Sequence, residues 1–340
     1  MSAESDKRRN AAKLRELAAG YWLSQCVAVV AELGVADLLN SGPKPVDELA
    51  RATATKSGPL YRVLRALASY GIFTESADHW FALTPMAEML QSSRDSLRGW
   101  AVLVGSEEFH RAWDDLRYSL KTGEPAFNHL YGASYWEHVS RNPKIAAIFN
   151  EGLTAYTSQV ASAVVAGYDF SQLRKLVDVG GGHGVLISAV LVANPKLRGL
   201  LFDLPHAREG ATRTLAEAAV RERCDIISGD FFQEIPKGAD AYLLSAVIHD
   251  WDDERALNIL GNCRRAMDAN ARLLLVEAVI PPGNEPFFGK LLDVHMLVIT
   301  DQGTDRTVAE YRTLLEKAGF KVSRIVPTAS DVSVIEALLA

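Results

Sequence analysis

Cysteine is scarce in this 340-residue chain, and neither charge sign dominates it. The three cysteines, Cys26, Cys224 and Cys263, form no CxxC pair, which argues against a disulfide framework or a zinc knuckle and favours a reducing compartment. The net charge is -6, so no overall positive field favours nucleic acid or an anionic membrane. With 48% hydrophobic residues, the composition is ordinarily globular, and two domains are expected.

Long apolar runs are also missing. The N-terminus is polar, carries Lys7, Arg8 and Arg9, and is followed by no signal-peptide core. The longest apolar stretches, such as 26–31, fall far short of the roughly 20 residues that cross a bilayer. We therefore expect a cytoplasmic protein with no membrane partner.

The first hundred residues have the periodicity of a small helical domain. Apolar residues recur at helical spacing over 11–39, and a second helix is expected over 59–70, where Gly71 ends it. Two short segments, 72–75 and 80–84, flank a polar turn and predict a hairpin. Helices followed by a hairpin are typical of a winged helix, which we predict for residues 1–100.

A winged helix suggests DNA binding, but the charge argues against it. Residues 1–100 hold about 12 Lys and Arg against about 11 Asp and Glu, so almost no positive excess is available to neutralise phosphates. The candidate recognition helix offers only Arg62 and Arg65 to a phosphate backbone. A structural, dimer-forming role and no nucleic-acid partner are expected.

Residues 101–165 are predicted to be a helical linker. The segment is rich in aromatic side chains, most of which we expect to pack in helix cores. A few could line an apolar pocket, so the linker is predicted to contribute to a ligand site.

From residue 173 onward, short apolar runs alternate with helical segments. Strands are expected at 176–179, 200–203, 224–228, 241–246 and 272–278, and a closing antiparallel pair at 322–326 and 332–337. This alternation predicts an α/β fold over 166–340, with a doubly wound, mostly parallel sheet. Ligands of such sheets bind at the carboxyl ends of the strands.

The strongest local signal is a glycine turn after the first of these strands. Residues 176–184 read LVDVGGGHG, and Asp203 ends the next strand, about 20 residues later, where a carboxylate can hold a ribose diol. The G-x-G-x-x-G spacing of a dinucleotide site fails after the second glycine, and no GK[ST] of a P-loop follows. A glycine turn without a phosphate clamp favours a nucleoside that lacks phosphates, such as S-adenosylmethionine.

Further motifs complete a family pattern. Besides residues 176–184, the chain carries FDLPH (202–206), GDFF (229–232), HDW (249–251), Glu277 and DRT (305–307). With these motifs the chain resembles the S-adenosylmethionine-dependent O-methyltransferases of the plant caffeate/flavonoid type and their bacterial natural-product relatives. The resemblance covers nearly the whole chain. It implies a Rossmann-like methyltransferase domain and an N-terminal winged-helix domain that forms an intertwined homodimer.

The resemblance also implies site residues. In the cofactor site, these are Gly180 and Gly182 beside the methionine part, Asp203 on the ribose, Leu204, Asp230 and Phe231 around the adenine, Trp251 packed nearby, and Thr157 at the methionyl end. Five residues fall where the family lines its acceptor pocket: Phe149, Leu153, Tyr156, Leu292 and Met296. His295, beside Met296, could line the same pocket.

Methyl transfer to a phenol calls for a base, because a phenol titrates near pH 10 and histidine suits a base that acts near neutrality. His249 follows the strand expected over 241–248 and so lies at the ligand edge of the sheet. Glu277 and Asp305 can reach that edge, where a carboxylate would fix the imidazole tautomer. Relatives usually carry Glu where this chain has Asp305. No clustered ligands suggest a metal, so no metal site is predicted.

These observations predict a homodimeric O-methyltransferase of secondary metabolism. The enzyme would move a methyl group from S-adenosylmethionine to a phenolic hydroxyl of a small aromatic compound and leave S-adenosylhomocysteine, with His249, Glu277 and Asp305 as its catalytic residues. Two alternatives stay open. One is a relative that uses the same cofactor for decarboxylation or hydroxylation, and the other is a winged-helix DNA-binding regulator.

Overall fold

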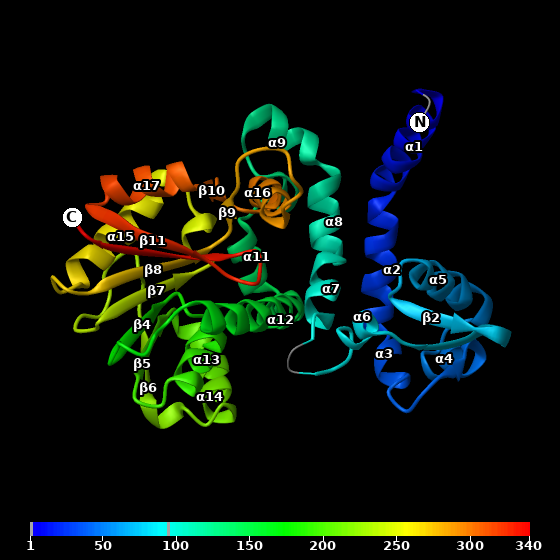
Figure 1. Ribbon diagram of the computed structural model, residues 1–340, viewed down its shortest axis with the longest axis horizontal. Helices are drawn as coiled ribbons and strands as arrows, with labels where there is room; N and C mark the ends of the chain where they lie inside the picture. Colours follow the sequence, from blue (N-terminus) through cyan, green and yellow to red (C-terminus); the bar gives the residue numbers. More distant parts are fainter. Residues whose placement is uncertain (1–2, 94–95) are drawn as a thin grey trace. The chain divides into compact units, whose positions relative to one another are not determined.

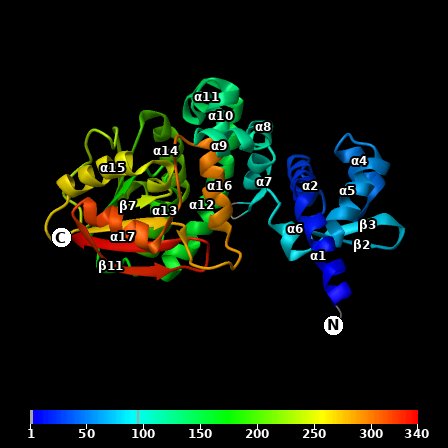
Figure 2. The same ribbon diagram turned by 90° about the horizontal axis from the view of Figure 1, so that it is seen from above.

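The chain forms two compact units in a computed structural model that describes residues 3–93 and 96–340 (Figures 1 and 2). The N-terminal unit comprises residues up to 110 together with 142–156, and the C-terminal unit comprises 111–141 together with 157–340. The chain therefore passes from one unit to the other three times. The segment predicted as one linker, 101–165, is shared between both units.

The N-terminal unit has helices and a small antiparallel sheet. Its helices are α1 (Ala3–Ala18), α2 (Gly20–Glu32), α3 (Val35–Leu38), α4 (Val46–Ala52), α5 (Ser57–Ser69), α6 (Pro85–Glu88) and α7 (Arg98–Val104). Strands β2 (Phe73–Ser76) and β3 (Trp80–Leu83) form the predicted hairpin, and β1 (Lys44–Pro45) pairs with β3. The helical run predicted over 11–39 is divided into three helices, and Gly34 separates the last two with a φ of +65°.

A series of helices spans residues 107–167. Helix α8 (Glu107–Asp114) leads into α9 (Leu116–Thr122), α10 (Ala126–Tyr131) and α11 (Tyr135–Arg141). The 25-residue helix α12 (Pro143–Gly167) then leads to the sheet of the C-terminal unit. No helix among the described residues is long and apolar enough to span a bilayer.

A seven-stranded, mostly parallel sheet forms the centre of the C-terminal unit, as predicted. Its strands lie in the order β11-β12-β8-β7-β4-β5-β6. The five from β4 to β8 are parallel, β12 runs antiparallel to β8, and β11 runs antiparallel to β12. The strands are β4 (Lys175–Val179), β5 (Arg198–Asp203), β6 (Cys224–Ser228), β7 (Ala241–Ser245), β8 (Arg272–Glu277), β11 (Phe320–Pro327) and β12 (Ser333–Leu339).

Helices flank this sheet (Figure 1). They are α13 (Val185–Ala193), α14 (Arg208–Glu217), α15 (Asp253–Ala266) and α17 (Val308–Lys317). Helix α16 (Phe288–Ile299) packs against α9 and α10 instead. Fully buried apolar residues, among them Val177, Tyr242 and Leu273, fill the core between the sheet and the helices. Two-residue strands β9 (Val279–Ile280) and β10 (Arg306–Thr307) pair in parallel outside the sheet.

The strand order reverses direction at β4. From β4 the chain first adds β5 and β6 on one side and then β7 and β8 on the other. Such a reversal leaves a crevice at the carboxyl ends of the two central strands, where ligands of open α/β sheets bind. The predicted glycine turn follows β4, and His249 follows β7, so both lie at this end of the sheet.

Candidate active site

The glycine turn after β4 has a left-handed backbone. Gly180 has a φ of +71° and Gly182 a φ of +54°, which glycine adopts without strain. A Cβ atom on Gly180 would lie 2.9 Å from Cγ2 of Val247, whereas a Cβ atom on Gly182 would meet no atom within 4 Å. The turn is therefore packed at Gly180 and open at Gly182, where a ligand can approach its backbone.

Asp203, the last residue of β5, is fixed by the turn itself. Its carboxylate accepts hydrogen bonds from the backbone N–H groups of Gly182 at 2.7 Å and Leu204 at 2.6 Å. Each carboxylate oxygen can accept a further bond, so two hydroxyl groups can still bind. The side chain of Leu204 is 45% exposed beside it. This arrangement suits a ribose diol, the role predicted for Asp203.

Aromatic rings lie beside the turn. Phe231 and Phe232 contact Trp251, with ring centroids 6.3 and 4.9 Å from its own. A Cβ atom on Gly180 would come within 3.5 Å of the Phe231 ring, which places these rings next to the glycine turn. The carboxylate of Asp230 accepts a hydrogen bond from the backbone N–H of Phe232 at 2.8 Å. A flat apolar base with a polar edge could bind here.

Polar groups without partners test whether this site fits S-adenosylmethionine. Among the described residues, the indole N–H of Trp251 and both carboxylate oxygens of Asp178 are buried and unpaired. Asp178 lies in β4, directly beneath the turn, since a Cβ atom on Gly181 would be 2.5 Å from its Oδ2. Buried polar groups normally have partners. The open turn, the ribose site and these unpaired groups therefore fit a nucleoside with a charged tail.

Four predicted residues lie on α12. Phe149, Leu153 and Tyr156 belong to the N-terminal unit, whereas Thr157 belongs to the C-terminal unit. Phe149 is buried and Leu153 is 36% exposed, and the ring of Tyr156 stacks on that of Trp100. Their roles at an acceptor pocket, and that of Thr157 at the methionyl end, stay predictions.

The other two residues predicted for the acceptor pocket lie on α16. Leu292 and Met296 are buried and stand one helical turn apart. Their contact with an acceptor also stays a prediction.

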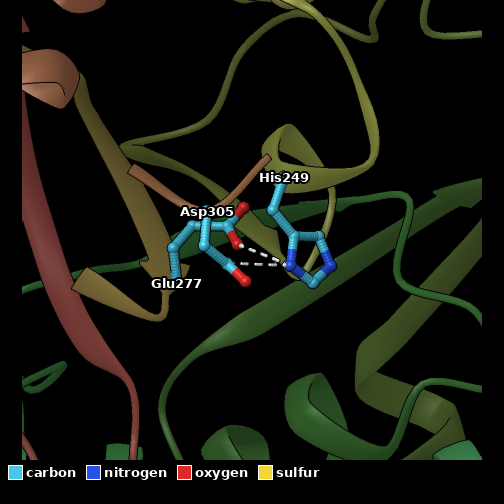
Figure 3. A group of neighbouring side chains, drawn as sticks. All are labelled: His249, Glu277 and Asp305. Carbon is cyan, nitrogen blue, oxygen red and sulfur yellow. Dashed lines mark hydrogen bonds and ion pairs between the residues drawn. The ribbon is translucent and has the colours of Figure 1, made fainter. Parts of the chain in front are cut away.

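His249 lies between carboxylates. Its Nδ1 atom is 3.2 Å from Oδ1 of Asp305, at hydrogen-bond distance, and 3.9 Å from Oε2 of Glu277. Figure 3 shows both carboxyl groups on the Nδ1 side of the ring and Nε2 on the other side. All three residues are buried. The structure thus brings together the histidine and the two carboxylates that the sequence singled out.

The backbone around His249 explains this placement. The sequence predicted a strand over 241–248 with His249 at its end. Strand β7 instead ends at Ser245, and His249 lies in a short 3-10 turn (Ile248–Asp250). Oε1 of Glu277 accepts hydrogen bonds from the N–H groups of Val247 and Ile248, at 3.2 and 2.9 Å. Glu277 thereby holds the turn that presents His249.

A third carboxylate, not assigned from the sequence, belongs to Asp250. Its Oδ1 atom lies 3.6 Å from Nε2 of His249, which is too far for a hydrogen bond. Although Asp250 is next to His249 in the sequence, nothing in the sequence pattern indicates on which side of the imidazole its carboxylate lies.

The protonation of the cluster follows from burial and charge. Burial opposes a charged imidazolium, but the carboxylates of Glu277, Asp250 and Asp305 outweigh it and raise the pKa of His249 to about 10. Burial also raises the pKa of Glu277 to about 7 and that of Asp250 to about 6, against the effect of His249. The site therefore stabilises a protonated imidazole, the form that a base reaches after it has accepted a proton.

The same three side chains could also hold a cation. One ligand atom each from His249, Glu277 and Asp305 lies within 4.8 Å of the others, a grouping that the sequence did not suggest. However, Nδ1 of His249 already contacts Asp305 directly, as in a base that is oriented by a carboxylate. We therefore keep the prediction that no metal acts here.

Comparison with protein families gives two matches. Residues 15–93 match an O-methyltransferase dimerisation domain, and residues 113–321 match an O-methyltransferase domain. The two matches follow each other along the chain and together cover most of it.

Individual proteins show the same similarity. A phenazine O-methyltransferase of Lysobacter antibioticus is 47% identical over 325 residues, 95% of each chain. A 3-amino-4-hydroxybenzoate 4-O-methyltransferase of Streptomyces cremeus is 37% identical over 96% of this chain and 90% of its own. A phenazine-1-carboxylate N-methyltransferase of Pseudomonas aeruginosa is 33% identical over 97% and 98%. The solved structure of CalO1, a methyltransferase in calicheamicin biosynthesis with S-adenosylhomocysteine bound, is 33% identical and covers all of both chains with a TM-score of 0.88.

Proposed function

The chain belongs to the O-methyltransferase family and is an S-adenosylmethionine-dependent methyltransferase. From this premise we propose that it methylates a phenolic hydroxyl of a small aromatic compound and that His249 is the general base. The observation that carries the proposal is the orientation of His249. Its Nδ1 atom faces Asp305 and Glu277, which leaves Nε2 as the atom that meets an acceptor hydroxyl.

The cofactor, when bound, supplies a sulfonium methyl group that a nucleophile displaces in line. The chain's own residues would hold the ribose, the methionine part and the adenine of this cofactor. Asp203 would bind the ribose hydroxyls while Gly182 allows the methionine part to approach the turn, and Asp230, Phe231 and Trp251 would bind the adenine. Because the leaving group is already good, the protein has to align the acceptor and strengthen it as a nucleophile.

His249 strengthens the acceptor by taking its proton. A phenol titrates near pH 10, and the pKa of His249 is raised to about 10 despite burial, because three carboxylates surround it. The two pKa values match, so the proton can pass from the hydroxyl to Nε2 at little free-energy cost in those molecules in which His249 is neutral, a form whose share grows as the pH rises toward about 10. Asp305 and Glu277 then stabilise the imidazolium that forms.

The same cluster favours oxygen over nitrogen as the methylated atom. One relative is named an N-methyltransferase, so the fold itself does not decide between them. An aromatic ring nitrogen has a free lone pair and no proton to lose, whereas a hydroxyl needs a base. Since His249 is held as a strong base, we infer that the acceptor atom is a hydroxyl oxygen on an aromatic ring, as the names of the O-methyltransferase relatives also suggest.

We also propose that two copies pair through the N-terminal unit. Four large apolar side chains on α1 and α2, Leu14, Leu17, Tyr21 and Trp22, are 60–68% exposed in the single chain. Exposed apolar surface of this kind usually marks an interface, and residues 15–93 match a dimerisation domain. Its symmetric partner would be a second copy of the chain.

A labelled-methyl assay tests the proposed reaction. The protein is incubated with S-adenosylmethionine labelled in the methyl group and with a panel of hydroxyphenazines, hydroxybenzoates and hydroxynaphthoates. We expect the labelled methyl group to be bonded to an ether oxygen in at least one product, identified by mass spectrometry and NMR. Label that appears only on nitrogen, or products that lose carbon dioxide or gain oxygen without label, would contradict the proposal.

Replacing Asp203 tests the cofactor site. Asp203→Ala removes the acceptor of two backbone N–H groups and of the ribose hydroxyls. Unsatisfied donors cost about 1–3 kcal/mol, so S-adenosylhomocysteine should bind about 10- to 100-fold more weakly in calorimetry. Asp225→Ala serves as the control because Asp225 is exposed in β6. Equal affinities in both variants would count against Asp203.

Removal of divalent cations tests the alternative use of the His249 cluster. Because Nδ1 of His249 bonds directly to Asp305, turnover should not change after treatment with EDTA and desalting. The measurement is the initial rate with an active acceptor, before and after addition of Mg²⁺ or Zn²⁺. A loss that either cation restores would assign a metal to the cluster.

A further inference from the structure

Arg306 is a buried arginine to which the mechanism assigns no role. It follows Asp305 in the chain and pairs in β10 with Val279 of β9, just after Glu277. Its side chain is only 3% exposed. A buried charge is costly unless it is paired and hydrogen-bonded. The position of this guanidinium therefore has to be explained by what it holds.

Every N–H group of the guanidinium has an acceptor. An arginine side chain carries five N–H donors in a fixed plane, and Arg306 makes five hydrogen bonds. Nε and Nη2 donate to Oδ1 of Asp253, at 3.2 and 3.0 Å. The other three bonds go to backbone carbonyl oxygens, those of Ile248 at 3.2 Å, Thr304 at 3.3 Å and Trp251 at 2.9 Å. Arg306 thus holds segments of the protein and has no donor left for a ligand.

Two of these carbonyl groups flank the base. Ile248 precedes His249, and Trp251 follows the 3-10 turn that carries it. A backbone bond joins the same segments, because the N–H of Thr304 donates to the carbonyl oxygen of His249 at 2.8 Å. The segments are in close contact, since a Cβ atom on Gly303 would lie 2.6 Å from that same oxygen. The turn of His249 is therefore attached to the segment that begins at Gly303.

The same segment carries the carboxylate that orients the base. Asp305 precedes Arg306, and its Oδ1 atom lies 3.2 Å from Nδ1 of His249 (Figure 3). Two neighbouring side chains thus act on one turn: Asp305 contacts the imidazole, and Arg306 holds the backbone around it. An increase of the Nδ1–Oδ1 distance to about 3.6 Å would end the hydrogen bond. A small shift between the two segments is therefore enough to release the base.

Asp253 holds the guanidinium from the protein surface. It is the first residue of α15, and its side chain is 60% exposed. Nε and Nη2 of Arg306 both reach the same oxygen of Asp253, so the planar guanidinium is held in one orientation. An exposed carboxylate thereby contributes to the position of a buried catalytic turn.

We propose that Arg306 is a positioning residue for the base: it attaches the turn of His249 to the segment of Asp305 and so sets the contact between the imidazole and its carboxylate. This inference rests on the proposed function, because the base that Arg306 aligns is the one that takes the acceptor's proton. Removal of Arg306 should slow the chemical step and leave the cofactor site unchanged. A residue that only stabilised the fold would lower the melting temperature without a change in the rate of the folded protein.

Four variants of the full-length protein test the proposal. Arg306→Met keeps an apolar stem and removes all five donors, whereas Arg306→Lys keeps the charge and some of the donors. Asp253→Ala removes the exposed partner of the guanidinium, a surface change that the fold should tolerate. Glu254→Ala is the matched control, because Glu254 is exposed and is the other acidic residue in the first turn of α15.

The rate of the chemical step is measured first, as single-turnover transfer of labelled methyl to an acceptor found in the labelled-methyl assay. A misplacement of about 1 Å can lower a rate by about 10²-fold, so we expect a loss of this order in Arg306→Met. Arg306→Lys and Asp253→Ala should lie between it and the wild type, and Glu254→Ala should equal the wild type. The KM of the acceptor and the affinity for S-adenosylhomocysteine should stay within about twofold in all four.

Proton NMR gives a second readout that needs no turnover. A carboxylate can only accept, so Nδ1 of His249 donates its proton to Asp305. The proton in such a charge-assisted bond gives a signal far downfield of the amide region and exchanges slowly with water while the bond lasts. In protein loaded with S-adenosylhomocysteine, the signal is assigned by its absence in His249→Gln. It should broaden or disappear in Arg306→Met and Asp253→Ala and persist in Glu254→Ala.

The outcomes decide in both directions. Loss of rate and of the NMR signal in Asp253→Ala and Arg306→Met, with both retained in Glu254→Ala, supports the inference. If Asp253→Ala keeps the wild-type rate or signal, or if cofactor affinity falls as much as the rate, the inference is wrong. Should Arg306→Met fail to fold, Asp253→Ala decides alone. Failure of the proposed function is seen separately, as the absence of any methyl ether, and the NMR comparison still reports on Arg306.

Discussion

The His249→Gln variant is expected to turn over about 10²–10⁴-fold more slowly than the wild type, the usual contribution of a positioned general base. Glutamine retains a hydrogen-bonding group of similar size but accepts no proton at neutral pH. His249 is not one of the residues assigned to the cofactor site. Binding of S-adenosylhomocysteine should therefore stay within about twofold of the wild type. Single-turnover transfer of labelled methyl measures the chemical step directly.

A control separates this effect from general damage to the protein. His79→Gln changes a histidine on the hairpin of the N-terminal unit, whose side chain is 56% exposed, and should leave the rate unchanged. If His249→Gln keeps most of its rate at neutral pH, another group removes the proton. If it loses cofactor affinity to the same extent as rate, the residue has a structural role instead.

Asp305→Asn is expected to lower turnover by about 10²-fold or more, because an amide can donate to Nδ1 of His249 and favour the wrong tautomer. It should also change the pH profile. Asp305 is one of the carboxylates that, against burial, raise the pKa of His249 to about 10, so its loss lowers that pKa. In the wild type the rate should rise with pH up to about pH 10, and in the variant the rise should occur at lower pH.

Asp305→Glu is the matched variant, because it keeps the carboxylate and adds only one methylene group. It keeps the negative charge and should retain most of the activity and the wild-type pH profile. The measurement is kcat against pH for the three proteins with one active acceptor. An Asn variant with an unshifted profile would show that Glu277, at 3.9 Å from Nδ1, orients the base without Asp305.

Much of this site can be read from the sequence because its signals are local. The glycine turn follows a short apolar strand, and Asp203 ends the next one, so the spacing alone predicts a nucleoside site at the carboxyl edge of the sheet. Glu277 ends another strand of the same sheet. Parallel strands bring their ends to one edge, and the structure places Glu277 and His249 together there.

The remaining features depend on contacts between distant parts of the chain. Trp113 and His295, which form a hydrogen bond between their rings, are 182 positions apart, and no periodicity or motif connects them. The unpaired oxygens of Asp178 beneath the turn are likewise invisible in a pattern that reads only as a buried strand. The raised pKa of His249 results, against burial, from three carboxylates that arrive from separate segments. Such contacts form only when the chain is folded, so no local pattern in the sequence indicates them.

The course of the chain limits how this protein can be divided. Residues 111–141 belong to the C-terminal unit, and residues 142–156 return to the N-terminal unit. No single cut therefore separates the two units, and any fragment that ends between them lacks residues that belong to one of the units. A gene fusion or recombination event that exchanged the catalytic half would have to carry the helices around residues 111–156 with it. The boundary between the two family matches, over residues 93–113, is thus not a point at which recombination or proteolysis would yield two complete units.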